Sequence, residues 1–409
     1  MTPFLQLAMA LALIITVAKI GGYLSFRIGQ PAVLGELFVG IILGPSVLDL
    51  FSIPYFTDQH LPEVIHQMAE MGVLLLMFLA GIELHLSDLL HSGKVAALAG
   101  TLGVILPLLL GAITGILFAM DIQPAIFLGL ILSATSVSIS AQTLMELKVL
   151  RSRVGVGLLG AAVFDDILVL LTLAIFTALT QPASGAGFFS IVWIVLKMAL
   201  FLGAASAIGW WAFPKMCRRI NSLPVSQGLI AFAFVTLLLY GWFAETIGQM
   251  AAITGAFLAG LWFSRTTEKE HIRNSIATIA YGVFVPIFFI NIGLSANARQ
   301  LTWNSALLML VMFLMAVIGK VFGSGSGALL GGLTRRESLQ LGVGMISRGE
   351  VGLIVAAIGV NEGLLHQNDF SAVVGVVILT TILTPLLLRA LFPKIKPAHP
   401  KAQKTLEGA

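Results

Sequence analysis

Charged residues are scarce in this chain, and their scarcity excludes a soluble globular fold. Asp, Glu, Lys and Arg make up 10% of the 409 residues, against about 25% in an average soluble domain. Hydrophobic residues make up 58%, which is more than a soluble core could bury. The formal net charge of +4 does not indicate nucleic-acid binding, because most Lys and Arg lie in short segments between apolar runs. The composition predicts a polytopic membrane protein surrounded by lipid.

Cysteine is almost absent, and this excludes two further kinds of site. Cys217 is the sole cysteine, so neither an internal disulfide nor a cysteine-based metal site is available. The histidines have no metal-ligand spacing, and we find no nucleophile–base pair. We therefore expect no enzymatic activity and no cofactor. Strict alternation of apolar and polar residues is missing as well, which argues against a membrane β-barrel.

Long apolar runs fill the sequence instead. A helix needs roughly 20 residues to cross the hydrocarbon core of a bilayer. We identify thirteen candidate spans, at about 4–26, 32–48, 64–86, 95–120, 124–145, 154–179, 188–213, 225–244, 249–264, 276–295, 305–330, 338–361 and 370–392. Thirteen spans predict an all-α fold of two six-helix repeats with inverted topology, joined by the seventh span. We expect the transmembrane domain to cover 1–393 and residues 394–409 to form a disordered cytoplasmic tail.

Basic residues are distributed unequally between the two sets of alternate loops. One set holds Arg27, Lys94, Lys148, Arg151, Arg153, Lys215, Arg218, Arg219, Arg265, Lys269, Arg273, Arg335 and Arg336, whereas the other holds Arg299 alone. Cytoplasmic loops carry an excess of Lys and Arg. The asymmetry predicts that the N-terminus lies outside and the C-terminus lies in the cytoplasm.

Two adjacent carboxylates, Asp165 and Asp166, lie in the middle of the sixth span. Each charged side chain at the bilayer centre costs about 2.5–3.5 kcal/mol on insertion scales, so such residues mark functional sites. Neighbouring helix positions differ by about 100° around the axis, so the two side chains face different surroundings. Carboxylate oxygen binds either a hard cation or a proton. The pair predicts a site where protons and an alkali cation compete.

The fifth and twelfth spans are interrupted at corresponding places in the two halves. Ser133 to Ser140 brings five hydroxyl groups to the middle of the fifth span, and Ser347-Arg348-Gly349-Glu350 interrupts the twelfth. Paired broken helices are the best sequence indication of a transporter binding site. Thr135 and Ser136 are either cation ligands or structural residues. Arg348 and Glu350 either stabilise the unwound segment or take part in coupling.

Lys320 lies deep in the eleventh span, where an ammonium group needs a carboxylate partner. We predict that Asp165 is this partner. A buried lysine can lose its proton, so the pair either carries a coupled proton or is a fixed structural ion pair.

Seven short stretches, in this order, make the chain resemble the bacterial monovalent cation:proton antiporters of the NapA and Kef kind. They are Gln30-Pro31-Ala32-Val33-Leu34-Gly35-Glu36 with Gly44-Pro45-Ser46, the run from Gly72 to Glu83, Ser133-Ala134-Thr135-Ser136-Val137, the run from Gly160 to Asp166, Pro286-Ile287-Phe288-Phe289, Gly319-Lys320, and the run from Arg348 to Ala357. The resemblance extends from the first span to the last.

The resemblance implies a NapA/NhaA-like fold with crossed broken helices. It implies a homodimer in the bacterial inner membrane, with dimerisation helices at about 4–86 and 225–295. Core helices then lie at about 95–179 and 305–392, with a linker helix at about 188–213. It implies that Asp166 binds the cation and that Asp165 pairs with Lys320. The acid pair resembles the electrogenic Na⁺/H⁺ branch, because the Kef-like branch typically lacks it.

The sequence therefore predicts an antiporter that exports Na⁺ or Li⁺ in exchange for external H⁺ by elevator-type alternating access, for sodium transport and pH homeostasis. Its partners are these ions, membrane lipid and a second copy of the chain. Two alternatives stay open at this point, a K⁺/H⁺ antiporter of the same fold and a gated cation channel.

Overall fold

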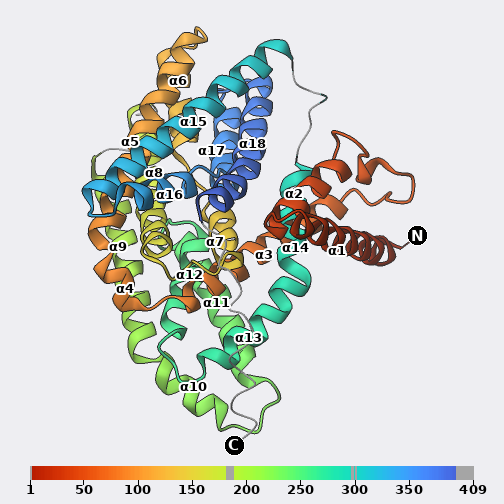
Figure 1. The fold of residues 1–409 in the computed structure, drawn as a ribbon, viewed down its shortest axis with the longest axis vertical. Coiled ribbons are helices and arrows are strands. Elements are labelled where there is room, and N and C mark those ends of the chain that lie inside the picture. Colours follow the sequence, from red (N-terminus) through yellow and green to blue (C-terminus); the bar gives the residue numbers. More distant parts are fainter. Residues whose placement is uncertain (1, 181–187, 296–298, 300–301, 393–409) are drawn as a thin grey trace, which may run out of the picture.

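The secondary structure of the described residues is entirely helical (Figure 1). The computed structural model describes residues 2–180, 188–295, 299 and 302–392. The first half comprises α1 (Pro3–Arg27), α2 (Ala32–Leu43), η1 (Leu50–Ser52), α3 (Leu61–Glu83), α4 (Leu86–His91), α5 (Gly93–Leu117), α6 (Ile122–Ser133), α7 (Val137–Glu146) and α8 (Arg153–Thr180). The second half comprises α9 (Phe188–Trp211), α10 (Phe213–Asn221), α11 (Gly228–Thr246), α12 (Ala252–Phe263), α13 (Lys269–Ile279), η3 (Ala280–Phe284), α14 (Val285–Leu294), α15 (Trp303–Leu330), α16 (Arg335–Gly344), α17 (Glu350–Asn361) and α18 (Gln367–Leu391).

Ten helices in the described part of the chain are long and apolar enough to cross a membrane. Two of these ten are composite, because Ile122–Glu146 contains α6 and α7, and Lys269–Leu294 contains α13, η3 and α14. Three shorter apolar helices, Ala32–Leu43, Ala252–Phe263 and Val351–Val360, lie in the expected second, ninth and twelfth spans. The protein is a multi-pass membrane protein, whereas the count of thirteen spans and the inverted repeats stay predictions.

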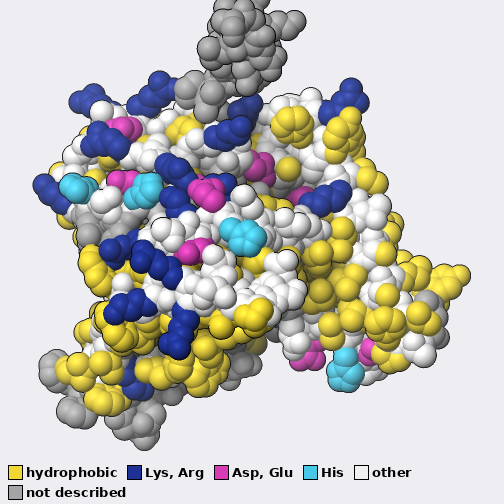
Figure 2. Space-filling view, turned by 90° about the horizontal axis from the view of Figure 1, so that it is seen from below, with side chains coloured by type: hydrophobic (Ala, Val, Ile, Leu, Met, Phe, Trp, Pro, Cys, Tyr) yellow, Lys and Arg dark blue, Asp and Glu magenta, His cyan; other side chains and the backbone are white. Residues whose placement is uncertain are grey.

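Some segments that we expected to be loops form short helices. Lys215, Arg218 and Arg219 lie on α10, and Lys269 and Arg273 lie on α13. Both helices are short and place polar residues beside apolar ones. Figure 2 views the molecule from below and shows many Lys and Arg side chains on this face. The corresponding sequence has too few apolar residues in a row to be recognised as a membrane span, and a short helix of this kind is stabilised mainly by tertiary packing.

Two groups of helices pack around different centres. In one, α5 lies against α6, α8 and α15, while α15 also contacts α16 and α18. In the other, α3 lies against α12 and α14, and α2 lies against α1 and α14. Figure 1 shows α15, α17 and α18 beside α5 and α6 in its upper part, with α10 to α13 below. The division into core and dimerisation domains, with α9 as a linker, stays a prediction.

Close packing within the first group depends on a row of glycines along α15. A side chain at Gly323 would collide with the carbonyl oxygen of Leu102, and one at Gly327 would collide with that of Leu98. Small residues at such positions let helix backbones approach each other in a membrane. The row therefore holds α15 tightly against α5, which keeps Lys320 close to α8.

Candidate functional site

The two interrupted helices meet at their breaks. α6 ends at Ser133 and α7 begins at Val137, whereas α16 ends at Gly344 and α17 begins at Glu350. The backbone N–H of Ser136 donates to the carbonyl of Ser347 at 2.9 Å, and the Ser347 hydroxyl donates to the carbonyl of Ser136 at 2.6 Å. The breaks thus join each other, because backbone groups freed from a helix need new partners inside a membrane.

Further short side chains surround the crossing. The Ser140 hydroxyl donates to the Gly344 carbonyl and lies 3.3 Å from the Ser347 hydroxyl. A side chain at Gly349 would collide with Ser136. Thr135 is buried, and its hydroxyl lies 3.5 Å from the Ser133 carbonyl. The expected site residues Thr135 and Ser136 therefore lie at the crossing, and their role as ligands or as structural residues stays a prediction. The side chain of Glu350 lies outside the described residues.

Arg348 fills the centre of the crossing. Its guanidinium donates to the carbonyls of Leu132 (2.6 Å) and Ile346, with longer contacts to those of Met345 and Ala316. Leu132 lies in the last turn of α6, and Met345 and Ile346 directly follow α16. Helix C-termini carry partial negative charge. Arg348 therefore places a positive charge at the ends of two half-helices, which favours the unwound segments, while a part in coupling stays a prediction.

Hydroxyl groups of α18 hold the backbone of the same residue. The N–H of Arg348 donates to the Thr380 hydroxyl at 3.2 Å, and the Thr381 hydroxyl donates to the Arg348 carbonyl at 2.9 Å. Both threonines are fully buried. The sequence analysis did not single them out, because a threonine in a membrane helix has many roles and gives no local signal.

Asp165 and Lys320 form a buried ion pair between α8 and α15. Lys320 Nζ lies 2.5 Å from Asp165 Oδ1, and both side chains have almost no exposure. The second oxygen, Asp165 Oδ2, is buried and has no hydrogen-bond donor among the described residues. The pairing that the sequence predicted is present in the structure, while its part in transport stays a prediction.

Asp166 faces the other group of helices. Its Oδ2 accepts a hydrogen bond of 2.8 Å from the hydroxyl of Thr254 on α12. Asp166 is 7% exposed and Thr254 is 3% exposed. Sequence reasoning missed Thr254, because it is a single hydroxyl in a short apolar helix. The contact places Asp166 at the boundary between α8 and α12.

The buried charges balance one another. Asp165 and Asp166 carry two negative charges when ionised, and Lys320 and Arg348 carry two positive charges. No cluster of three or more His, Cys, Asp or Glu suited to a resident metal occurs in the part of the chain that the structure describes. An arriving cation would add a positive charge to a balanced, poorly solvated centre. Release of protons is the chemistry by which such a centre restores its balance.

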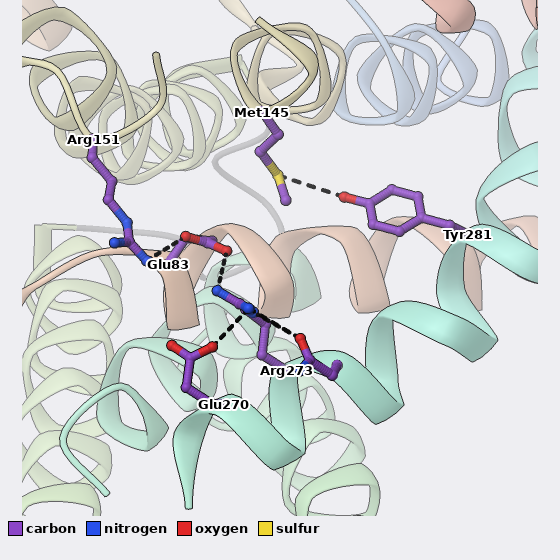
Figure 3. A network of polar contacts seen from close by, with 7 residues as sticks. Glu83, Met145, Arg151, Glu270, Arg273 and Tyr281 are labelled. Carbon is purple, nitrogen blue, oxygen red and sulfur yellow. Dashed lines mark hydrogen bonds and ion pairs between the residues drawn. The ribbon is translucent and has the colours of Figure 1, made fainter. Parts of the chain in front are cut away.

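An ionic network joins the same two groups of helices at the basic face. Glu83, at the end of α3, binds Arg151 at 2.6 Å and Arg273 at 3.2 Å (Figure 3). Arg273 also binds Glu270 at 2.6 Å. Arg151 lies just before α8, and Arg273 lies on α13. These side chains are partly exposed, so each ion pair contributes little to stability.

Comparison with known proteins identifies the family. The model of the sodium/hydrogen exchanger transmembrane family matches residues 12–394. This chain belongs to that family of monovalent cation:proton antiporters. It is 40% identical over 383 residues to the Na(+)/H(+)-K(+) antiporter GerN of Bacillus cereus, covering 93% of this chain and 95% of that protein. It is 34% identical over 385 residues to a Na(+)/H(+) antiporter of Enterococcus hirae, covering 94% and 98%.

A solved structure shares the fold. The sodium proton antiporter MjNhaP1 from Methanocaldococcus jannaschii matches with a TM-score of 0.67 over 95% of this chain and 97% of that chain. The sequence identity is 16%, so this likeness concerns the arrangement of helices alone. The all-helical architecture predicted from the sequence therefore agrees with the helix arrangement of this solved structure.

Proposed function

We propose that this protein is an electrogenic antiporter that exchanges cytoplasmic Na⁺ or Li⁺ for external H⁺, with Asp166 as the cation-binding residue. The observation that supports this most directly is the different pairing of two adjacent carboxylates. Asp165 is held by Lys320 on α15, whereas Asp166 meets a neutral hydroxyl on α12. The Asp166 carboxylate lies where the two groups of helices meet, which suits it to bind a cation that arrives from solution.

Charge balance provides the coupling in this proposal. Binding of Na⁺ at Asp166 adds a positive charge next to the Asp165–Lys320 pair. In the proton-loaded state Asp166 is protonated, so Asp165, Asp166, Lys320 and Arg348 together carry one net positive charge. Na⁺ replaces the Asp166 proton, and loss of a second proton from the Lys320 ammonium leaves the sodium-loaded centre neutral, because desolvated centres disfavour uncompensated charge. The exchange of two protons for one Na⁺ is electrogenic. An empty site with uncompensated charge crosses the membrane poorly, which limits leak.

Elevator-type movement provides alternating access in the same proposal. The crossed breaks are hydrogen-bonded to each other and to α18, so they are suited to move as one body. The Thr254–Asp166 contact instead joins this body to α12 and must break when the body slides. We further propose a homodimer formed by α1 to α3 and α11 to α14, in a bacterial inner membrane, with the C-terminus in the cytoplasm.

Potassium is the second candidate substrate. The name of the Bacillus cereus relative includes K⁺ beside Na⁺ and H⁺, and this relative is 40% identical over 93% of the present chain. Selectivity between these ions depends on cavity geometry at the level of tenths of an ångström, and Asp166 carries no signal for either ion.

The test is proton flux in proteoliposomes that contain the purified protein. Na⁺, Li⁺ and K⁺ are added in turn across a range of pH, with and without an imposed membrane potential. We expect cation-driven proton movement that saturates and responds to the potential. Current far above transporter turnover without obligatory proton movement would identify a channel, and potential-independent exchange would refute electrogenic coupling.

A further inference from the structure

A cavity with several polar side chains in its lining lies apart from the acid pair. It has a volume of about 470 Å³ and opens among α1, α2, α7 and η3. Glu36, Gln30 and Gln142 line it together with Lys19, Glu146 and Arg389. Neither aspartate of the pair, nor Lys320 or Arg348, lines this cavity. Its surroundings include the α1–α2 turn and the end of α18, which belong to the face that the loop charges assign to the cytoplasm.

Two residues of this cavity carry a buried amide oxygen without a donor. Gln142 Nε2 donates to Glu146 Oε1 at 2.9 Å, which fixes the amide orientation and leaves Gln142 Oε1 without a partner. Gln30 Oε1 is also buried without a partner in the described structure. A buried acceptor without a donor costs about 1–3 kcal/mol. Two such oxygens around one cavity point to a ligand that interacts with electronegative atoms.

Glu36 is the carboxylate left available in this group. It is 7% exposed, and no hydrogen bond or ion pair engages its side chain among the described residues. Glu146 differs, because its two oxygens accept from Gln142 and from the N–H of Ala32 at 2.7 Å. Glu83, which borders the adjoining cavity, is occupied by Arg151 and Arg273.

The basic side chains of the cavity are engaged elsewhere. Lys19 Nζ donates to the Tyr281 carbonyl at 2.7 Å, and Arg389 Nε donates to the Gly29 carbonyl at 3.0 Å. Neither forms an ion pair with Glu36 in the described structure. Lys19 and Arg389 offset the negative charge of the cavity, but they do not bind the Glu36 carboxylate.

We propose that Glu36, Gln142 and Gln30 form a second binding site for a hydrated monovalent cation, separate from Asp166. One carboxylate and two amide oxygens are hard ligands suited to an alkali ion, and a divalent ion usually takes more carboxylates. The cavity volume leaves room for several waters of the hydration shell. Cation binding at this site does not depend on the proposed function, but its role in transport does. During export, Na⁺ from the cytoplasm binds first at this site and then moves to the acid pair.

Binding in an Asp166→Asn background tests the site without relying on transport. The full-length variant in detergent is titrated with ²²Na⁺ in the presence of choline chloride at constant ionic strength. We expect saturable binding that remains in Asp166→Asn and is lost in Asp166→Asn with Glu36→Gln. Absence of saturable binding in Asp166→Asn, or its persistence after Glu36→Gln, would overturn the proposal. Competition by K⁺ and by choline separates specific alkali-ion binding from general screening.

Matched variants separate a ligand role from a change in folding. Glu70→Gln removes a carboxylate from α3, where Glu70 is 64% exposed and pairs with His66, and we expect it to leave binding unchanged. Gln142→Met removes the amide oxygen by a different substitution and should weaken binding as well. In the chain with an intact Asp166, Glu36→Gln should raise the apparent KM for Na⁺ about tenfold, a factor that corresponds to about 1.4 kcal/mol. An unchanged KM in a folded variant contradicts a loading role.

Discussion

Asp165 and Asp166 are neighbours in the chain and have the same side chain, yet their surroundings differ. Asp165 is fully buried and bound to Lys320 within one group of helices. Asp166 reaches the other group and accepts a hydrogen bond from Thr254 on α12. The rotation of about 100° between adjacent helix positions produces this difference. One carboxylate is thus paired within its own group of helices, and the other lies where that group meets its neighbour.

The comparison separates stability from exchange. In the proposed mechanism, an ion pair within the moving group of helices is present in both orientations, so its loss should affect mainly folding and the number of coupled protons. A carboxylate at the boundary would meet different partners in each orientation, so its loss should affect mainly cation binding. Four variants test this division.

Asp166→Asn should have the largest effect on exchange. The amide has nearly the same shape but neither binds a cation as a charged ligand nor releases a proton. We expect cation-dependent proton flux in proteoliposomes to be abolished, with a thermal unfolding temperature close to that of the unmodified protein. Exchange at the unmodified rate would refute Asp166 as the site.

Lys320→Ala should have the largest effect on stability. It leaves the Asp165 charge buried without its partner, which costs about 3–5 kcal/mol in comparable cases. We expect a clear fall in thermal stability in detergent, partly restored by adding Asp165→Asn. Where exchange survives, the reversal potential should show fewer protons per cation. If neither the stability nor the coupling ratio changes, the ion pair has no such role.

Thr254→Val should have a smaller, selective effect. It keeps the shape of the side chain but removes the hydroxyl that orients Asp166, a hydrogen bond worth about 1 kcal/mol or somewhat more. We expect the apparent KM for Na⁺ to rise several-fold with little change in stability. Thr254→Ser serves as the control and should behave like the unmodified protein. Equal effects of valine and serine would instead indicate a packing role for the methyl group.

Glu337→Gln should have the smallest effect on stability. Glu337 is a surface carboxylate and serves as a comparison for the two buried aspartates. The Thr334 backbone N–H donates to Glu337 and lowers the pKa of this carboxyl, with help from the Thr334 hydroxyl and from Arg153. Because the folded pKa is lowered, the stabilisation is full above the ordinary pKa of 4.5 and is lost as the pH falls through the folded value. Thermal unfolding of both proteins should therefore differ slightly near pH 6 and converge on acidification. A difference that grows on acidification would contradict this sign.

Much of the site could be predicted from the order of residues alone. A lysine in the middle of an apolar run requires a carboxylate, and the sequence offers an acid pair at matching depth, so the Asp165–Lys320 contact was foreseeable. The interruptions were foreseeable too, because serine, glycine and charged residues disturb otherwise apolar helices. The structure places these breaks at 134–136 and 345–349, close to the stretches that the sequence indicated.

Other parts could not be predicted, because their partners are distant in the chain and chemically ordinary. Thr254 is one hydroxyl among many, and nothing in its local sequence marks it as a partner of Asp166. Gln30 and Gln142 are separated by more than a hundred positions, and only the packing of α2 beside α7 brings them to one cavity. The four carbonyl groups around Arg348 are backbone atoms, which every residue possesses.

The sequence by itself determined the membrane-embedded helical class, the position of the acid pair and the need of Lys320 for a counter-charge. These follow from the free energy of burying charge in hydrocarbon, which depends on residue type and depth. Only the tertiary structure decided which helix each carboxylate faces, how the two breaks hold each other and which oxygens are left without a donor. Such features depend on the angles at which helices cross, and the spacing of residues along one chain does not specify them.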